Sequence, residues 1–306
     1  MSDLKSWFVI INPTSGNGTA KKQWPKIRSL LNLHNFEFQF QFTKHAKHSL
    51  EIIHNTVNQG FKKFIIVGGD GTLHNVVNGI FKQKKCNPDS ISVGIIPIGT
   101  GNDWIKTYGI SKKPELAIQT ILNNSTKTQD IGKIEFLNPK HKPIYFNNLA
   151  GIGFDGFVVS KVSKYKKLGA IAYLLASLIG LFSFSNFKAE VFINSKRIKS
   201  KVLMVVIGLC KYSGGGMRLT ETPNPADGFF DISLAKDLSK FEILRALPNL
   251  FNGKIINNSK IETYKSKTIE VVTKGDVEPL VEADGELIGK GDFKISIIEN
   301  SFRFYA

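Results

Sequence analysis

The sequence predicts a mixed α/β protein with two domains: an N-terminal α/β domain with a mainly parallel sheet, and a C-terminal, largely antiparallel β-rich domain. Up to residue 122, short apolar runs alternate with segments of helical spacing, a pattern typical of parallel strands joined by helices. After about residue 130, strand-like segments follow one another, punctuated by Gly, Pro and Asn. A chain of 306 residues is also long enough for two hydrophobic cores. We therefore expect residues 1–130 and 299–306 to form the first domain and residues 131–298 the second.

Each expected strand of the first domain is followed by a helix. Apolar runs, one of them a strict alternation of Phe with polar residues, predict strands at residues 7–12, 36–42, 64–67 and 93–97. Apolar residues at helical spacing predict helices at residues 20–33, 50–59, 73–81 and 114–122. Ser49 is the expected N-cap of the second helix.

Strands dominate the second domain. They are expected at residues 145–149, 190–194, 202–209, 229–235, 268–272, 281–283 and 293–298. Two helices interrupt them, near residues 168–183 and 239–252. The apolar segment from Leu168 to Phe187 approaches the ~20 residues of a membrane span. Because it contains Gly, Ser and Asn, we favour a buried or cleft-lining helix.

The chain is strongly basic, with 41 Lys and Arg against 25 Asp and Glu and a net charge of +16. Such an excess favours an anionic partner: nucleic acid, an anionic membrane surface or phosphorylated small molecules. A generally basic proteome would give the same excess. No strand interleaves aromatic with basic residues convincingly, so we expect no nucleic-acid partner. Lys161, Lys164, Lys166 and Lys167 precede an apolar segment, which suits docking on an anionic bilayer or, equally, a solvated loop.

The cellular setting follows from the cysteines and the first residues. Cys86 and Cys210 lie far apart and are expected to be free thiols in a reducing compartment. Residues 1–5 lack the apolar stretch of a signal peptide. We expect a cytoplasmic protein with peripheral membrane contact. The sequence is compatible with a homodimer but does not fix the oligomeric state.

Three loops follow expected strands of the first domain, at residues 12–18, 68–72 and 99–103. Carboxyl ends of parallel strands share one edge of a sheet, so the loops should converge on one crevice. Backbone N–H groups at Gly68, Gly69 and Gly71 would approach an anion closely, aided by the dipole of the following helix. Hydroxyl groups come from Thr72 and Thr100. Asp70 and Asp103 beside phosphate would require a cation between them, which Mg²⁺ supplies.

These motifs resemble the diacylglycerol kinase catalytic domain, especially the bacterial soluble diacylglycerol and YegS-type lipid kinases. The resemblance rests on five segments in order: Asn-Pro-Thr-Ser-Gly at 12–16, Gly-Gly-Asp-Gly-Thr at 68–72, Pro-Ile-Gly-Thr-Gly-Asn-Asp at 97–103, Asp-Ile-Gly at 130–132 and the stretch 147–155. It implies an ATP-dependent lipid kinase of phospholipid metabolism, with ATP bound between a nucleotide domain and a lipid-substrate domain.

The same resemblance implies site residues. The expected nucleotide contacts are Asn12, Ser15, Gly16, Thr43, Gly68, Gly69, Asp70, Gly71, Thr72 and Thr100. Asp70, Asp103 and Asp130 would form the acidic network around catalytic Mg²⁺. The turn at residues 224–229 resembles the family's metal turn, so its ligands would be Asn224, Asp227 and Phe229. A plain Asp-Gly hairpin is the structural alternative there.

Asp284-Gly285-Glu286 resembles the family's Asp-Gly-Glu, in which the Glu is the general base. A lipid hydroxyl is a weak nucleophile, and a carboxylate within hydrogen-bond reach can take its proton. Asp284 would orient Glu286 or the magnesium waters.

Two departures from the family pattern are present. His74-Asn75 stands where bacterial relatives commonly have Asn-Glu, and Asn17 stands where several carry a basic residue that Lys21 or Lys22 would replace. The lipid itself stays open. Two alternatives also remain: a kinase of NAD, which shares Gly-Gly-Asp-Gly-Thr, and a non-catalytic basic protein that binds membrane or nucleic acid.

Overall fold

The computed structural model describes residues 6–138, 141–162 and 183–306. The chain divides into two compact units, Met1–Gln129 with Asn300–Ala306, and Asp130–Glu299. The helix expected near residues 168–183 and the lysines at 164, 166 and 167 lie outside the described residues, apart from Ser183.

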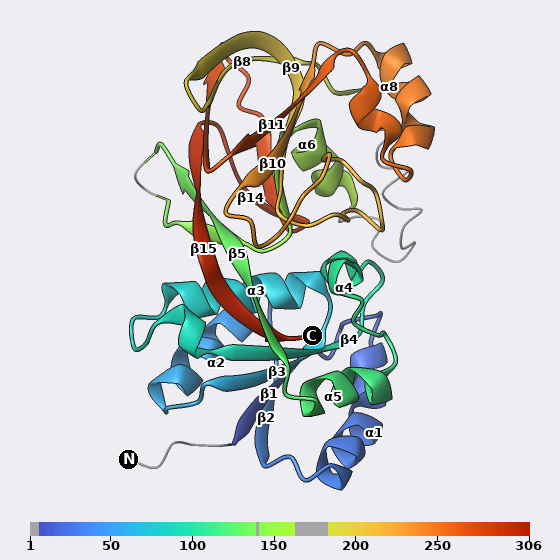
Figure 1. Cartoon of the computed structure of the whole chain (residues 1–306), viewed down its shortest axis with the longest axis vertical. Coiled ribbons are helices and arrows are strands. Elements are labelled where there is room, and N and C mark those ends of the chain that lie inside the picture. Colours follow the sequence, from blue (N-terminus) through green and yellow to red (C-terminus); the bar gives the residue numbers. More distant parts are fainter. Residues whose placement is uncertain (1–5, 139–140, 163–182) are drawn as a thin grey trace. The chain divides into compact units, whose positions relative to one another are not determined.

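The first unit is built on a parallel sheet (Figure 1). Its strands run in the order β2, β1, β3, β4, with the end of β15 beside β4. Their bounds are β1 (Trp7–Ile11), β2 (Phe38–Phe42), β3 (Lys63–Gly68), β4 (Ser92–Pro97) and β15 (Phe293–Tyr305). The mainly parallel N-terminal sheet is thus confirmed.

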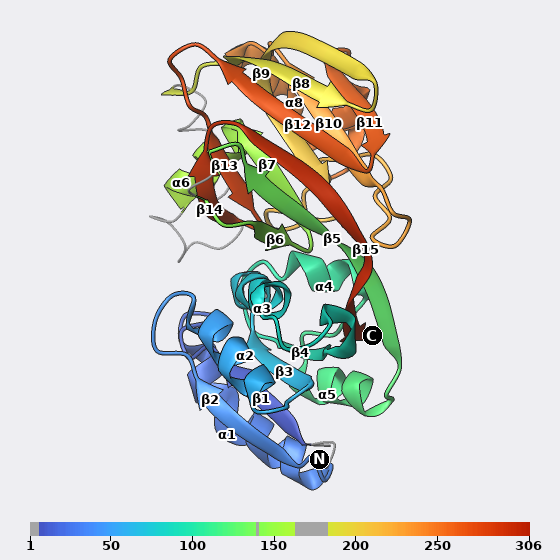
Figure 2. The ribbon, with the colours of Figure 1, turned by 90° about the vertical axis from the view of Figure 1, so that its left-hand side faces the viewer.

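Helices cover both faces of this sheet (Figures 1 and 2). On one face, α1 (Thr19–Leu33) and α5 (Pro114–Leu122) share a core with the odd-numbered residues of β1. Trp24 of α1 packs against the rings of Phe38, Phe40 and Phe42, which explains the alternation along β2. On the other face, α2 (His48–Asn58) packs on α3 (Asp70–Lys82).

The expected cap of α2 is wrong. The helix begins at His48 with Lys47 at the N-cap in the left-handed region, at φ 64°, and no side chain caps it. Ser49 lies inside the helix and is buried. The helix therefore starts before the serine that was expected to precede it.

The second unit is antiparallel and β-rich, as predicted. Its main strand order is β14, β13, β7, β9, β8, β12, β15, with β10 joining β9 to β11 and β5 joining β6 to β15. Figure 2 shows these strands in the second unit. Their bounds are β5 (Thr126–Phe136), β6 (Ile144–Phe146), β7 (Leu149–Gly153), β8 (Phe187–Ile193), β9 (Lys196–Gly208), β10 (Phe230–Lys236), β11 (Ile261–Ser266), β12 (Thr268–Lys274), β13 (Leu280–Ala283) and β14 (Glu286–Lys290).

The helices that the structure describes in this unit are short. α6 (Phe154–Val162) follows β7 directly. α8 (Lys240–Ala246) opens with a capping box between Ser239 and Glu242, and one 3₁₀ turn (Leu247–Asn249) continues it. The helix expected at 239–252 is therefore shorter than predicted. Among the described residues, no helix has both the length and the apolar character needed to cross a membrane.

Candidate active site

The loop after β3 is shaped by glycine and threonine. A Cβ on Gly68 would lie 2.6 Å from Thr72 Oγ1, so only glycine allows the threonine hydroxyl to fold back over the strand end. α3 begins at Asp70 with Gly69 as N-cap, and no side chain caps it. Gly69, Asp70 and Gly71 are partly exposed. The first turn of α3 thus offers N–H groups and the positive end of the helix dipole to an anion.

The loop after β1 is joined to the loop after β3. Asn12 Nδ2 donates a hydrogen bond to Thr72 Oγ1 at 3.0 Å, and Asn12 Oδ1 accepts from the Thr14 N–H and hydroxyl. Gly16 has φ 60° and Gly18 has φ 88°, so the chain turns sharply here before α1 begins. The expected convergence of these two loops is therefore seen within the first unit.

The third loop meets the second through glycines and Asp70. A Cβ on Gly99 would lie 3.2 Å from Gly69 Cα, so the two loops approach at backbone distance. Asp70 Oδ2 accepts the N–H of Asp103 at 3.0 Å, at the start of α4 (Asp103–Tyr108). The Asp70 carboxylate therefore fixes the position of α4 relative to α3.

Two carboxylates border the space above Gly101. A Cβ there would lie 3.2 Å from Asp70 Oδ2 and 3.7 Å from Asp103 Oδ2. Asp103 is buried, and its Oδ1 accepts from Lys106 Nζ at 2.6 Å. Carboxylate oxygens that border one space are suited to a hydrated Mg²⁺ ion. Asp70 and Asp103 fit the expected cation.

For the other residues expected to contact the nucleotide, the structure gives fewer contacts with these loops. The Thr43 N–H donates to Ile11 O at 2.8 Å, which puts Thr43 beside the end of β1. Ser15 is half-buried and Thr100 is exposed. His74, one of the departures from the family pattern, is buried and lies 3.3 Å from Asn78 Nδ2 through its Nε2. Its neighbour Asn75 bonds back to Gly71 O at 2.9 Å, so both side chains are engaged within α3.

In the second unit, Asp130 fastens the expected metal turn. Its Oδ2 accepts the Gly228 N–H at 2.8 Å, and its own N–H donates to Pro225 O at 2.7 Å. Asp130 is fully buried. These bonds make Asp130 the anchor of the turn at residues 224–228, and its expected role around a metal stays a prediction.

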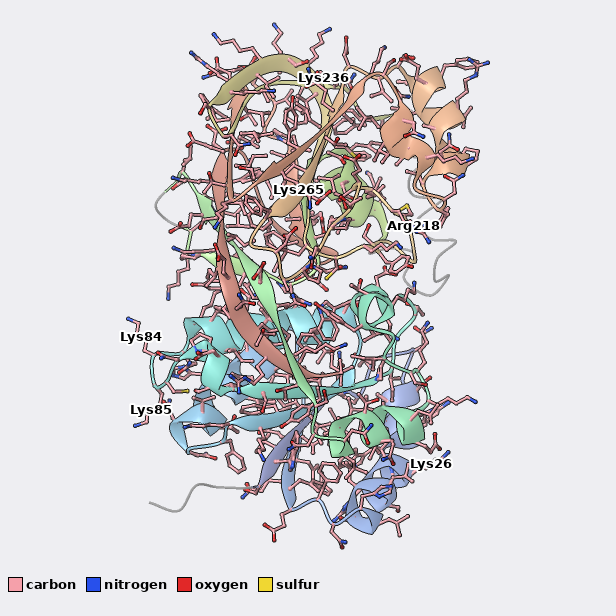
Figure 3. The ribbon with its side chains drawn as sticks, viewed as in Figure 1. Lys26, Lys84, Lys85, Arg218, Lys236 and Lys265 are labelled. Atoms are coloured by element: carbon pink, nitrogen blue, oxygen red, sulfur yellow. The ribbon has the colours of Figure 1, made fainter. Side chains whose placement is uncertain are left out.

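The Asp227 carboxylate already accepts hydrogen bonds from two donors of the protein. Oδ1 accepts the Phe229 N–H at 3.0 Å and Oδ2 accepts Lys265 Nζ at 3.1 Å. The hydrogen bond to Asp227, aided by the charge of Asp231, raises the pKa of Lys265. Figure 3 labels Lys265 in the second unit. A cation bound by Asp227 would have to displace this ammonium group, just as a cation bound by Asp103 would compete with Lys106.

Asp284 clamps the segment between β6 and β7. Its carboxylate accepts three backbone N–H groups: Asn148 at 2.9 Å, Asn147 at 3.2 Å and Leu149 at 3.3 Å. The strand expected at 145–149 is split into β6 and β7 because these groups turn to Asp284 instead of pairing with a strand. Asp284 itself has φ 51°, as expected at a tight turn.

The turn held by Asp284 carries Glu286, the first residue of β14. Glu286 is half-buried, and its carboxylate has no hydrogen bond or ion pair within the part of the chain that the structure describes. A carboxylate without a partner can accept a proton from a hydroxyl group that comes within hydrogen-bond reach.

Sequence reasoning missed a buried carboxyl pair beside this turn. Glu282 Oε2 accepts the Gly285 N–H at 2.8 Å, and the Glu282 side chain lies beside that of Asp155. Burial raises the pKa of Asp155 to about 6, and burial with the charge of Asp155 raises the pKa of Glu282 well above its usual range. The pair therefore holds a proton near neutral pH.

A cavity of about 280 Å³ opens in the second unit near the start of α6. Apolar side chains from several elements line much of it, among them Phe154, Leu203, Leu238 and Ile243. Polar groups are also present, including Asn186 and Lys201.

Comparisons with known proteins agree with this geometry. Residues 6–134 match the diacylglycerol kinase catalytic domain, and residues 148–305 match the YegS C-terminal NAD kinase beta sandwich-like domain. A Bacillus subtilis protein provisionally named lipid kinase YtlR is 28% identical over 96% of this chain and 97% of its own. A diacylglycerol kinase of the same organism is 27% identical over 94% of this chain and 91% of its own. The crystal structure of a diacylglycerol kinase from Bacillus anthracis covers 100% of this chain and 98% of its own with a TM-score of 0.73 at 20% identity, which shows a shared fold.

Proposed function

Because the chain belongs to the diacylglycerol kinase family, with a catalytic domain followed by a YegS-type C-terminal domain, we propose that it transfers the γ-phosphate of ATP to the hydroxyl of a lipid such as diacylglycerol. The enzyme class, a lipid kinase, follows from the family and its relatives. The use of ATP and Mg²⁺, the acceptor and the residue roles are the proposal.

The first unit supplies the phosphate site. The loops after β1, β3 and β4 are tied together by the Asn12–Thr72 bond and by the bond from the Asp103 N–H to Asp70. N–H groups at the start of α3 would face the phosphates. Mg²⁺ above Gly101 would reduce the repulsion between the negatively charged phosphates and the two carboxylates. This two-carboxylate space is the observation that carries the proposal.

The second unit supplies the acceptor chemistry. Glu286 would take the proton of the lipid hydroxyl as the phosphoryl group arrives, while Asp284 holds the backbone that positions it. The cavity lined by Phe154 and Leu203 would accept part of an acyl chain. We assign the catalytic Mg²⁺ to Asp70 and Asp103 first, because their two carboxylates border one space. Asp227 enters the proposal as a metal ligand only if Lys265 leaves it.

The test is a panel of lipids with radiolabelled ATP and Mg²⁺ in mixed micelles. We expect radiolabel to appear in one lipid class, and no labelled lipid when EDTA removes the Mg²⁺. Glu286→Gln should lower turnover by roughly 10²–10⁴-fold. Glu37→Gln, which removes an exposed carboxylate in the first unit, is the matched control and should leave turnover unchanged. Label in NAD and in no lipid would replace this proposal with an NAD kinase, and full activity of Glu286→Gln would remove Glu286 from the reaction.

A further inference from the structure

Large apolar side chains are exposed along the helical segment after β10. Phe241 is 65% exposed, Leu244 47% and Phe251 48%. The opposite side of α8 is buried through Ile243 and Ala246. Figure 1 shows this segment at the edge of the second unit, outside its strands. Exposed aromatic and aliphatic side chains gathered on one short segment indicate a contact surface.

The segment is held firmly in place. The capping box of Ser239 and Glu242 fixes its start, and Lys260 Nζ lies 2.8 Å from Glu242 Oε2. At its other end, Leu250 O accepts the Arg218 N–H at 2.7 Å, and the Leu250 side chain packs on a buried cluster that includes Met217. The exposed side chains are therefore displayed on a preformed backbone.

Positive charge surrounds these side chains. Residues 240–260 contain Lys240, Arg245, Lys254 and Lys260 but only one acidic residue, Glu242. The Arg245 guanidinium lies 5.1 Å from the centre of the Phe241 ring. Arg245 and Lys254 also line a hollow of about 460 Å³, together with asparagine side chains. Apolar anchors beside cations are complementary to a bilayer that carries anionic lipid.

We propose that Phe241, Leu244 and Phe251 form a docking surface for an anionic bilayer, with Arg245 and Lys254 against the lipid phosphates. The apolar side chains enter the interfacial region, and the cations stay at head-group level. This inference rests on the proposed function in one respect, that the acceptor is a lipid held in a membrane. Vesicle binding itself is measured without turnover.

The first experiment uses Phe241→Trp in the full chain. The native tryptophans, Trp7, Trp24 and Trp104, are all buried, so they should not respond to vesicles. With vesicles of phosphatidylcholine and phosphatidylglycerol, the new tryptophan should shift its emission to the blue and be quenched by brominated acyl chains. Vesicles of phosphatidylcholine alone should give a much smaller shift, and salt should weaken the response. No shift with either vesicle would overturn the proposal.

Co-sedimentation with the same vesicles gives the second readout. Phe241→Ser combined with Leu244→Ser should weaken binding to anionic vesicles by about tenfold or more. Arg245→Gln should weaken it for anionic vesicles only. Leu116→Ser, on an equally exposed leucine of the first unit, is the matched control and should bind as the unchanged chain does. Equal loss in Leu116→Ser, or a dimer in gel filtration that the double variant dissociates, would overturn the proposal.

A third arm separates this inference from the proposed function. The double variant should phosphorylate a short-chain lipid in detergent micelles as fast as the unchanged chain, because the micelle presents the substrate without a bilayer. An unchanged chain that binds vesicles but phosphorylates no lipid would leave the docking surface standing and remove the kinase assignment. If the double variant misfolds by circular dichroism, Phe251→Ser replaces it.

Discussion

Removing the Asp284 carboxylate should destabilise the second unit. Asp284→Ala would leave three backbone N–H groups, those of Asn147, Asn148 and Leu149, without their acceptor in a buried environment. An unsatisfied buried donor costs about 1–3 kcal/mol, and the two longer bonds count for less than the 2.9 Å bond. We expect a loss of roughly 3–5 kcal/mol in the free energy of unfolding.

Such a loss is large enough to measure as a melting temperature. At about 2–4 °C per kcal/mol for a domain of this size, Asp284→Ala should melt roughly 6–20 °C below the unchanged chain. Asp284→Asn keeps one carbonyl oxygen and tolerates the left-handed φ of 51°, so its loss should be smaller, about 1–2 kcal/mol. Differential scanning calorimetry measures the melting temperatures of the two variants, and the turnover assay measures their activity.

Glu286→Gln is the internal comparison, because it changes a carboxylate without a partner two residues away. We expect its melting temperature to stay within about 2 °C of the unchanged chain while turnover falls. The reasoning is refuted if Asp284→Ala melts with the unchanged chain, or if Glu286→Gln loses as much stability as Asp284→Ala.

Two further predictions concern the buried carboxyl pair and the first glycine loop. Because the folded protein holds protons on Asp155 and Glu282 that the unfolded chain releases near pH 4, their contribution to stability should fall as pH rises above about 4, with the Asp155 part lost by about pH 6. Urea unfolding should show Glu282→Gln gaining stability relative to the unchanged chain across that window, and a difference independent of pH would contradict the raised pKa values. Gly68→Ala would push a methyl group to within 2.6 Å of Thr72 Oγ1 and break its bond with Asn12, so KM for ATP should rise at least about tenfold. An unchanged KM would show that this loop does not bind the nucleotide.

The sequence predicted the sheet of the first unit well because β1, β3 and β4 are nearly continuous apolar runs and β2 alternates strictly between Phe and Gln. The same reasoning missed α4, since six residues are too few for helical periodicity to be visible. It also joined β6 and β7 into one strand. The apolar pattern continues through the break, whereas the cause of the break is the Asp284 carboxylate, 136 residues away from Asn148. Bonds between distant segments are not encoded in local spacing.

The candidate site shows the same limit. Motif resemblance located Asp130, Asp227 and Glu286, but a motif does not say which carboxylate is already engaged. The partner of Asp227 is Lys265, on a strand that the sequence did not predict. Glu282 was missed because a glutamate on a strand is ordinarily solvated, and only the fold shows that it is buried against Asp155.

The carboxylates of the candidate site differ in the hydrogen bonds that they accept from the protein. Asp70, Asp130 and Asp284 accept backbone N–H groups and fix α4, the turn at residues 224–228 and the segment between β6 and β7. Glu286 has no such partner among the described residues. A carboxylate that holds backbone groups cannot move or take up a proton without loosening the structure, whereas one without partners can accept a proton at little structural cost. This difference supports the proposed role of Glu286 in proton transfer, while Asp70, Asp130 and Asp284 each hold the backbone segment that they bind.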